Sequence, residues 1–187
     1  MTKSEKLNKV AKEIEKCKIC KIGKFGKAVP GEGKPDAKII FIGEAPGRQE
    51  STAGRPFVGR SGQYLTRLIE STGLDRKDVF ITSPVKYYPV ISQKGRTPSD
   101  TEIAHGKIHL VKQLEIIKPK IIVLLGRVAA IALLGKSQVV SRMHGKLIKQ
   151  DNKTYFLTYH PAAAIRFQKN KALIEEDFRI LKRFLNS

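Results

Sequence analysis

A run of apolar residues leads directly into a glycine-rich stretch, and this order constrains the fold more than any other feature. Residues 38–42 read KIIFI, and residues 43–62 read GEAPGRQESTAGRPFVGRSG, with five glycines. An amphipathic segment follows at residues 63–72. A strand, a long loop and a helix in this order place the loop outside the carboxyl end of a strand, where open α/β sheets bind their ligands.

Apolar runs alternate with segments of helical periodicity along the rest of the chain. We expect strands at residues 38–42, 79–82, 121–125, 146–150 and 154–159. We expect helices at residues 4–15, 63–72, 97–118 and 127–134, and a final one with a buried stripe of Ile174, Phe178, Leu181 and Leu185. The third of these begins with Thr97 as N-cap and Pro98 at its first position. Residues 21–34 and 87–95 are expected to be loops.

This alternation predicts the fold class. Strands that alternate with helices indicate a parallel sheet with helices on both sides. We therefore expect an α/β fold, a three-layer α/β/α sandwich around a central, mainly parallel sheet. The length of 187 residues predicts a single domain over residues 1–187.

The chain carries a large excess of positive charge. Lys and Arg number 36 against 17 Asp and Glu, which gives a formal charge of +19. Because this excess is spread through the chain, we expect a polyanionic partner, with nucleic acid as the first candidate. A ribosomal or merely soluble basic protein is the alternative, but it does not account for an acidic, glycine-rich loop.

The sequence also predicts where the protein works. It has no secretory signal and no apolar run near 18 residues, so we expect no membrane segment and a cytoplasmic location. We expect a monomer. Frequent Lys, Ile and Arg and the absence of Trp suit a thermophile.

Three predicted strand ends carry candidate site residues. Glu44 and Glu50 are acids with no helical or strand reason to lie in the glycine-rich loop, and Phe57 is a stiff aromatic suited to support a flat ligand. Ser83 and His160 directly follow two other predicted strands. Because the carboxyl ends of parallel strands meet at one edge, these residues predict a binding crevice. A disordered loop is the alternative, but the two prolines and the apolar residues around the phenylalanine argue against it.

Two separated motifs in this order resemble those of the uracil-DNA glycosylase superfamily, most closely its family 4, the thermostable bacterial and archaeal type. The first motif comprises residues 43–47 (GEAPG), Glu50, Gly54, residues 56–59 (PFVG) and Gly62. The second comprises residues 159–163 (YHPAA). The resemblance extends from Cys17 to the C-terminal helix. It implies an enzyme that flips uracil out of DNA and hydrolyses its N-glycosidic bond, which leaves an abasic site and starts base excision repair.

The resemblance also implies a role for each residue of the crevice. The residues expected to bind the base are Gly43, Ala45, Pro46, Gly47, Phe57 and Ser83. Phe57 would stack on uracil, and His160 would hydrogen-bond a carbonyl oxygen of uracil as negative charge moves onto the base. Other branches have an Asp at the position of Ala45. We therefore assign the acid that positions water to Glu44 first and Glu50 second, although either could instead brace the loop by accepting backbone N–H bonds.

One departure from the family concerns the choice of base. Ser83 stands where the family usually has Asn, which reads the uracil edge with both a donor and an acceptor. Hypoxanthine or xanthine is therefore an alternative substrate. A member of the superfamily that binds DNA but has lost catalysis is the alternative function.

The residues after the second motif resemble the segment of the family that enters DNA. Ile165 would be an apolar wedge in the gap left by the flipped base, and Arg166 and Arg60 would contact phosphates. The alternative is that these residues only form the start of a helix and carry ordinary surface charge. Replication or repair proteins could be partners besides DNA.

A second departure from the family concerns metal. Cys17 and Cys20 form a CxxC, which suits metal or redox use in a reducing compartment better than a disulfide. The resemblance implies a four-iron four-sulfur cluster on four cysteines, but Tyr87 and Gly106 occupy the third and fourth positions. We therefore expect no intact cluster, and the chemistry itself needs no cofactor.

Two histidines offer a different set of ligands. His105 and His109 are four residues apart on one helix face, and with Cys17 and Cys20 they would form a Cys₂His₂ site suited to structural zinc. The alternative is a lost metal, with tyrosines filling the gap and both histidines facing solvent. We favour this alternative, because motif matches often arise by chance.

Overall fold

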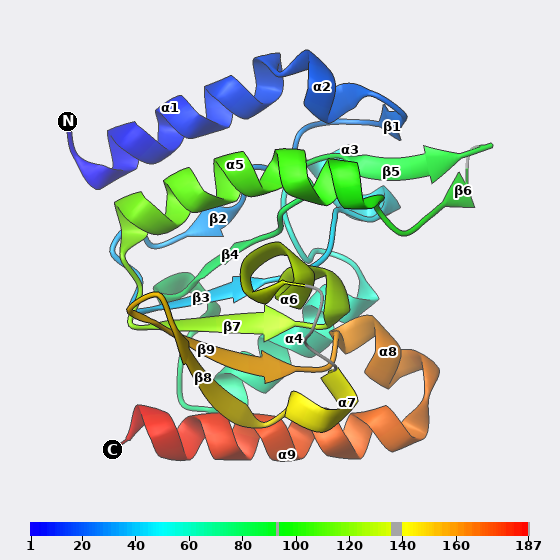
Figure 1. Cartoon of the computed structure of the whole chain (residues 1–187). Coiled ribbons are helices and arrows are strands. Elements are labelled where there is room, and N and C mark those ends of the chain that lie inside the picture. Colours follow the sequence, from blue (N-terminus) through cyan, green and yellow to red (C-terminus); the bar gives the residue numbers. More distant parts are fainter. Residues whose placement is uncertain (93, 136–139, 187) are drawn as a thin grey trace.

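The computed structural model of the chain describes residues 1–92, 94–135 and 140–186. Its centre is a six-stranded sheet with the order β2-β4-β3-β7-β9-β8 (Figure 1). The strands are β2 (Glu32–Gly33), β3 (Ile39–Ile42), β4 (Phe80–Thr82), β7 (Ile121–Leu125), β8 (Lys146–Gln150) and β9 (Lys153–Thr158). The four inner strands run parallel and both edge strands pair antiparallel. The predicted mainly parallel sheet is therefore confirmed.

Helices cover both faces of this sheet (Figure 1). One layer contains α1 (Lys3–Lys16), α5 (Asp100–Ile117) and α6 (Arg127–Leu134), and the other contains α4 (Arg60–Ser71), α8 (Pro161–Arg166) and α9 (Gln168–Leu185). The shorter helices are α2 (Lys18–Lys21), α3 (Arg48–Ala53), the 3₁₀ turn η1 (Arg76–Asp78) and α7 (Val140–Met143). Both layers bury apolar side chains against the sheet, so the inner strands are apolar on both faces. This is the predicted three-layer α/β/α arrangement.

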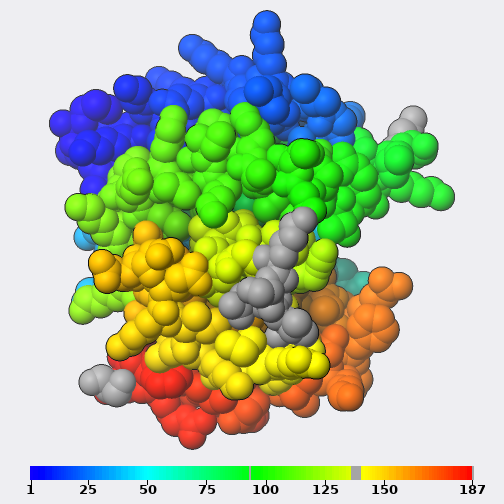
Figure 2. Space-filling view, viewed as in Figure 1, coloured from blue at the N-terminus to red at the C-terminus, as the bar shows by residue number. Residues whose placement is uncertain are grey.

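The two ends of the chain lie in opposite layers. Figure 2 shows the N-terminal residues, in blue, lying along the green segment that contains α5. The orange and red residues of α8 and α9 form the other side of the molecule. Within the described part of the chain, no helix is both long enough and apolar enough to span a membrane.

A small second sheet corrects two predicted loops. β1 (Lys24–Phe25), β5 (Tyr88–Ile91) and β6 (Lys94–Gly95) pair antiparallel in the order β1-β5-β6. These strands lie in residues 21–34 and 87–95, where loops were predicted. The prediction was wrong because strands this short, rich in glycine and proline, have no periodicity of their own and form only by pairing with distant residues.

The glycine-rich stretch is not one continuous loop, because α3 lies inside it. Glu50 is the third residue of α3, and its carboxylate accepts the backbone N–H of Gly47 at 3.1 Å, which caps the first turn. The expectation that this acid has no helical role was therefore wrong. A smaller correction concerns α5, whose N-cap is Ser99 and not Thr97. Ser99 and Glu102 form a reciprocal capping box, which outweighs the signal from the preceding proline.

Phe178 tests whether α9 holds its layer onto the sheet. The Phe178 side chain is 1% exposed, and its ring stacks on that of Phe41 in β3 with centroids 6.1 Å apart. We expect Phe178→Ala to lower the free energy of unfolding by about 3–5 kcal/mol, because it leaves a cavity in the core. The measurement is urea denaturation. Phe184→Ala is the control on the same helix, since Phe184 is 41% exposed. Equal losses in both variants would contradict this packing.

Candidate active site

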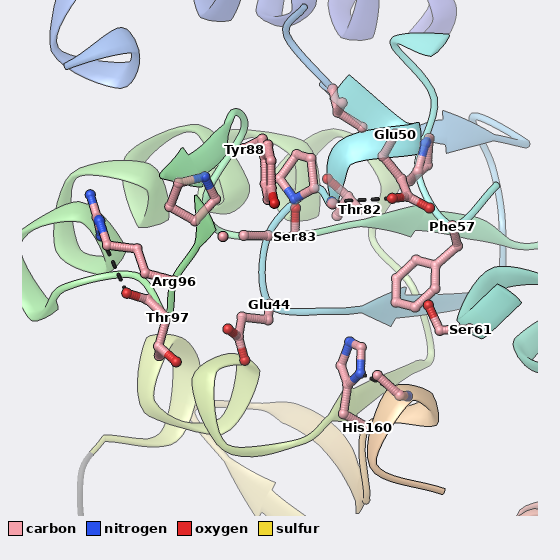
Figure 3. A pocket seen from close by; sticks show the side chains of 18 residues that line it. Glu44, Glu50, Phe57, Ser61, Thr82, Ser83, Tyr88, Arg96, Thr97 and His160 are labelled. Atoms are coloured by element: carbon pink, nitrogen blue, oxygen red, sulfur yellow. Dashed lines mark hydrogen bonds between the residues drawn. The ribbon is translucent and has the colours of Figure 1, made fainter. Parts of the chain in front are cut away.

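A cavity of about 420 Å³ opens at the carboxyl ends of β3, β4 and β9 (Figure 3). The predicted residues that line it are Glu44, Ala45, Pro46, Gly47, Glu50, Phe57, Ser83 and His160. Gly43 is the exception, because it lies buried beneath the ring of Phe57. The structure thus brings residues from three distant segments to the sheet edge at which the sequence placed them.

The ring of Phe57 forms one wall of the cavity. Its backbone has φ of +51°, a left-handed conformation that bulky residues adopt only where the surroundings enforce it. A Cβ at Gly43 would lie 2.7 Å from the Phe57 ring, so only glycine allows the ring to rest on the end of β3. The ring also stacks with the imidazole of His160, with centroids 5.6 Å apart and an interplanar angle of 29°. The two flat side chains therefore form one corner of the cavity.

His160 lies two residues after the last residue of β9, Thr158, and is the N-cap residue of α8. Its Nδ1 accepts the backbone N–H of Ala162 at 3.2 Å. Burial lowers the pKa of His160 to about 4, so the ring is neutral at neutral pH. A neutral imidazole whose Nδ1 is an acceptor carries its proton on Nε2, which makes Nε2–H a donor.

The position of His160 depends on a glycine in the neighbouring strand connection. Gly126 follows β7 and has φ of +87°. A Cβ at Gly126 would lie 2.9 Å from the Cβ of His160. Both the backbone conformation and the close approach to His160 require glycine here. The end of β7 therefore helps to set the position of the imidazole.

Glu50 braces the glycine-rich stretch. Besides the N–H of Gly47, its carboxylate accepts the backbone N–H groups of Val58 and Gly59, each at 2.9 Å. These three bonds join the start of α3 to the residues that enter α4. Hydrogen bonds to a charged acceptor are stronger than neutral ones. The geometry therefore fits the alternative in which this acid holds the loop.

Glu44 has a different environment. Its side chain is half-buried and reaches into the cavity (Figure 3). Within the described residues, its carboxylate accepts no hydrogen bond from the protein. Burial raises the pKa of Glu44, and the positive charge of Arg127 opposes that effect. Its oxygens are therefore available to a water molecule or a ligand.

Ser83 lies at the back of the cavity and is 6% exposed. Its hydroxyl donates to the backbone oxygen of Val85 at 2.7 Å. The single hydroxyl proton is therefore used inside the protein, and only the lone pairs of Oγ remain for a ligand. Ser83 can accept a hydrogen bond from a ligand but cannot donate one without giving up the contact with Val85.

Several cavity residues were not predicted from the sequence. They are Val29, Pro56, Ser61, Thr82, Tyr88, Pro89, Gly95, Arg96, Thr97 and Ala162. The cavity residues between 88 and 97 lie in or next to the small second sheet. No periodic pattern in the sequence predicts that sheet. Arg96 forms a two-pronged ion pair with Glu102 at 2.7 and 2.8 Å.

A buried lysine supports the cavity from below. The ammonium of Lys86 donates to Thr82 Oγ1 at 2.7 Å, Gln113 Oε1 at 2.8 Å and the backbone oxygen of Pro30 at 3.2 Å. These acceptors use all three of its donors. Burial lowers the pKa of Lys86 to about 7. Since Thr82 lines the cavity, this network fixes the end of β4.

Two of the three predicted DNA-contacting residues, Ile165 and Arg60, lie beside the cavity entrance. Ile165 is 43% exposed on α8, and Arg60 is exposed at the start of α4. Both line a shallow hollow of about 360 Å³ that shares Glu50, Ser61 and Ala162 with the main cavity. Arg166 is exposed but does not line this hollow, and its guanidinium lies 5.4 Å from the ring centre of Phe167.

The four proposed metal ligands lie together, away from this cavity. Donor atoms of Cys17, Cys20, His105 and His109 all lie within 4.8 Å of one another. The expectation that both histidines face solvent was wrong, because His109 is only 7% exposed. Tyr87 does fill space beside the cysteines, as expected, and is 3% exposed.

The chain belongs to the uracil-DNA glycosylase superfamily, because the family model described as "Uracil DNA glycosylase superfamily" matches residues 30–182. Among curated proteins, the chain is 44% identical to a type-4 uracil-DNA glycosylase of Saccharolobus solfataricus, covering 98% of this chain and 88% of that protein. It is 37% identical to the type-4 enzyme of Archaeoglobus fulgidus (94% and 91% covered) and 35% identical to that of Thermotoga maritima (98% and 97% covered). The predicted resemblance to the superfamily and its type 4 is confirmed.

The protonation of His160 can be measured directly. Because burial lowers the pKa of His160 to about 4, its imidazole signals should stay constant as the pH falls from 8 towards 5, where an ordinary histidine titrates with a pKa of about 6.5. The measurement is an NMR titration, with His160→Gln used to assign the signals. The unfolded state takes up its proton first, so this residue should make the fold less stable as pH falls from about 6.5 to about 4. A midpoint near 6.5 would contradict the lowered pKa of His160.

Proposed function

We propose that the protein is a monofunctional uracil-DNA glycosylase, which hydrolyses the N-glycosidic bond of uracil in DNA and leaves an abasic site. The observation that carries this proposal is a single cavity that holds a stacking ring, a neutral imidazole donor and a free carboxylate. Family membership and the likeness to type-4 enzymes support it. The protein would act inside the cell as a single-domain monomer that starts base excision repair.

Phe57 and His160 would act on the base. Flipping a nucleotide costs a few kcal/mol of unstacking, which the cavity must return through stacking and edge contacts. The fixed ring of Phe57 supplies the stacking surface. As the N-glycosidic bond breaks, negative charge moves onto the uracil oxygens, and the Nε2–H of His160 donates to one of them. A neutral donor that is already oriented stabilises this developing charge without reorganising.

Glu44 would act on the sugar side. The sugar becomes cation-like as the bond breaks, and a nearby carboxylate both stabilises that charge and orients the attacking water. Glu44 has free oxygens in the cavity, whereas the Glu50 oxygens are taken by three backbone N–H groups. We therefore propose that Glu44 orients the attacking water and that Glu50 positions the glycine-rich stretch. None of these steps uses a cofactor.

DNA would bind over the cavity entrance. The net charge of +19 attracts the phosphate backbone, and the exposed residues Arg60, beside the entrance, and Arg166, on α8, would contact phosphates. Ile165 projects from α8 beside the same hollow and would fill the gap left by the flipped base. This arrangement keeps the phosphates outside and admits only the uncharged base to the acidic cavity.

One prediction of the proposed function concerns catalysis by His160. On a labelled oligonucleotide with one uracil, opposite guanine or in single strand, we expect His160→Ala to cut the single-turnover rate by about 10²–10³-fold, since one donor to developing charge is lost. Alkali treatment reveals the abasic sites. The control is Lys12→Ala, exposed on the outer layer in α1, with the fold of each variant checked by circular dichroism. If the wild type binds the uracil oligonucleotide without cleaving it, the same assay is repeated with hypoxanthine and xanthine. If none of these bases is released, the result favours a DNA-binding protein without catalytic activity.

The second prediction concerns the DNA path. Arg60→Ala and Arg166→Ala should each weaken binding to any sequence and reduce the slope of log affinity against log salt by about 1. Ile165→Ala should lower affinity for a uracil-containing duplex and leave the salt slope unchanged, because it removes an apolar wedge. Fluorescence anisotropy at several salt concentrations measures both effects. The control is Lys153→Ala, at the opposite edge of the sheet. If this variant changes the salt slope as much as the arginine variants do, the proposed DNA path over the cavity entrance is wrong.

A further inference from the structure

The cluster of Cys17, Cys20, His105 and His109 joins the N-terminal helices to α5. Cys17 lies between α1 and α2, Cys20 lies in α2, and the two histidines lie one turn apart on α5. Figure 1 shows α1 running alongside α5, with α2 at its end. Ligands from separate elements are thus brought to one place by packing of the first helical layer.

The spacing of the donor atoms suits one ion. Cys17 Sγ and His105 Nε2 are 3.2 Å apart, and all four donor atoms lie within 4.8 Å of one another. Zinc bonds of about 2.3 Å to sulfur and about 2.0–2.1 Å to nitrogen place tetrahedral ligands roughly 3.3–3.8 Å apart. Small side-chain shifts would therefore bring all four atoms to a central ion.

A second observation points to a missing ligand at this place. Both ring nitrogens of His109 are buried and have no hydrogen-bond partner among the described residues. A buried polar group without a partner destabilises the folded protein, and native proteins rarely leave one. A metal bound to one of these nitrogens gives that nitrogen a partner, whereas without a metal neither nitrogen has one among the described residues.

The residues present do not fit the four-iron cluster of the family. Tyr87 holds the third position, and its hydroxyl contacts the backbone oxygens of Ile14 and Glu15 at 3.4 and 3.3 Å. A Cβ at Gly106, the fourth position, would lie 2.1 Å from the backbone oxygen of Pro84, so that backbone has no room for a cysteine. Two of the four thiolates that such a cluster needs are absent.

A two-iron cluster with Cys₂His₂ ligation fits no better. In that cluster the cysteines bind one iron and the histidines bind the other, so sulfur and nitrogen ligands belong to different metal atoms. Here a sulfur and a nitrogen, Cys17 Sγ and His105 Nε2, lie 3.2 Å apart, within a set of four donor atoms that all lie within 4.8 Å of one another. That arrangement matches the mixed ligand shell of a single ion.

We propose that Cys17, Cys20, His105 and His109 bind one zinc ion. Four protein ligands fill a tetrahedral shell, so the site is structural, with no open position for water or substrate. The ion ties the α1–α2 connection to α5. It also acts on the cavity wall at a distance, because β1 follows α2 and pairs with β5, whose Tyr88 and Pro89 line the cavity.

The test is metal content and spectroscopy of the full chain, which need no catalytic activity. Protein made with zinc and iron both available, then dialysed against a weak chelator, should retain equimolar zinc. Replacing zinc by Co²⁺ should give the intense visible bands of a tetrahedral site and a thiolate charge-transfer band. Zinc should fall to background in Cys20→Ser and His109→Ala and persist in His144→Gln, a histidine outside the cluster.

Two results would overturn the proposal. One is iron with acid-labile sulfide in the wild type, which would show a cluster. The other is wild-type protein that is folded by circular dichroism but holds no zinc after dialysis and gives no tetrahedral cobalt spectrum. Both readouts use the wild type, so they decide the question even if a variant fails to fold. Neither depends on uracil cleavage, so failure of the proposed activity would leave the zinc result intact.

Discussion

The three hydrogen bonds accepted by the Glu50 carboxylate are the constraint on which the cavity depends. They tie the start of α3 to the residues before α4 and close the glycine-rich stretch into one rigid piece. Phe57 lies inside that closed piece, which explains how a bulky residue keeps a φ of +51°. The ring is then held over Gly43 and against His160. The Glu50 carboxylate thus determines the shape of the cavity wall formed by Phe57.

Charge is divided between the inside and the outside of the site. The chain as a whole is strongly positive, which favours contact with phosphates at the surface. The cavity itself contains the carboxylates of Glu44 and Glu50 beside a neutral imidazole. Such a cavity repels an anion and accepts an uncharged base, and it favours a sugar that gains positive charge. The same division argues against a phosphate ligand in the glycine-rich stretch.

The sequence predicted those parts of the structure that depend on long, local patterns. Apolar runs identified the parallel strands, and the place of His160 directly after one of them put it at the correct edge of the sheet. Short elements were missed because their stability comes from distant partners. α3 depends on the Glu50 carboxylate, and β5 depends on β1, more than sixty residues earlier in the chain. Helical spacing placed His105 and His109 on one face, but only the packing of α1 and α2 shows that His109 is buried.

Three consecutive residues link the two functional regions of the fold. Tyr87 packs with Cys20 beside the proposed zinc ligands, Lys86 holds Thr82 under the cavity, and Tyr88 lines the cavity itself. Packed side chains therefore connect the N-terminal helices to the cavity, while the proposed zinc ligands themselves do not line it. Tyr87 also shows how a thiolate ligand can be absent without leaving a void, because its ring occupies the space and its hydroxyl contacts the end of α1. A site that serves only to fix this connection can change its metal and ligands as long as the connection stays fixed, whereas the cavity requires its own residues for the chemistry.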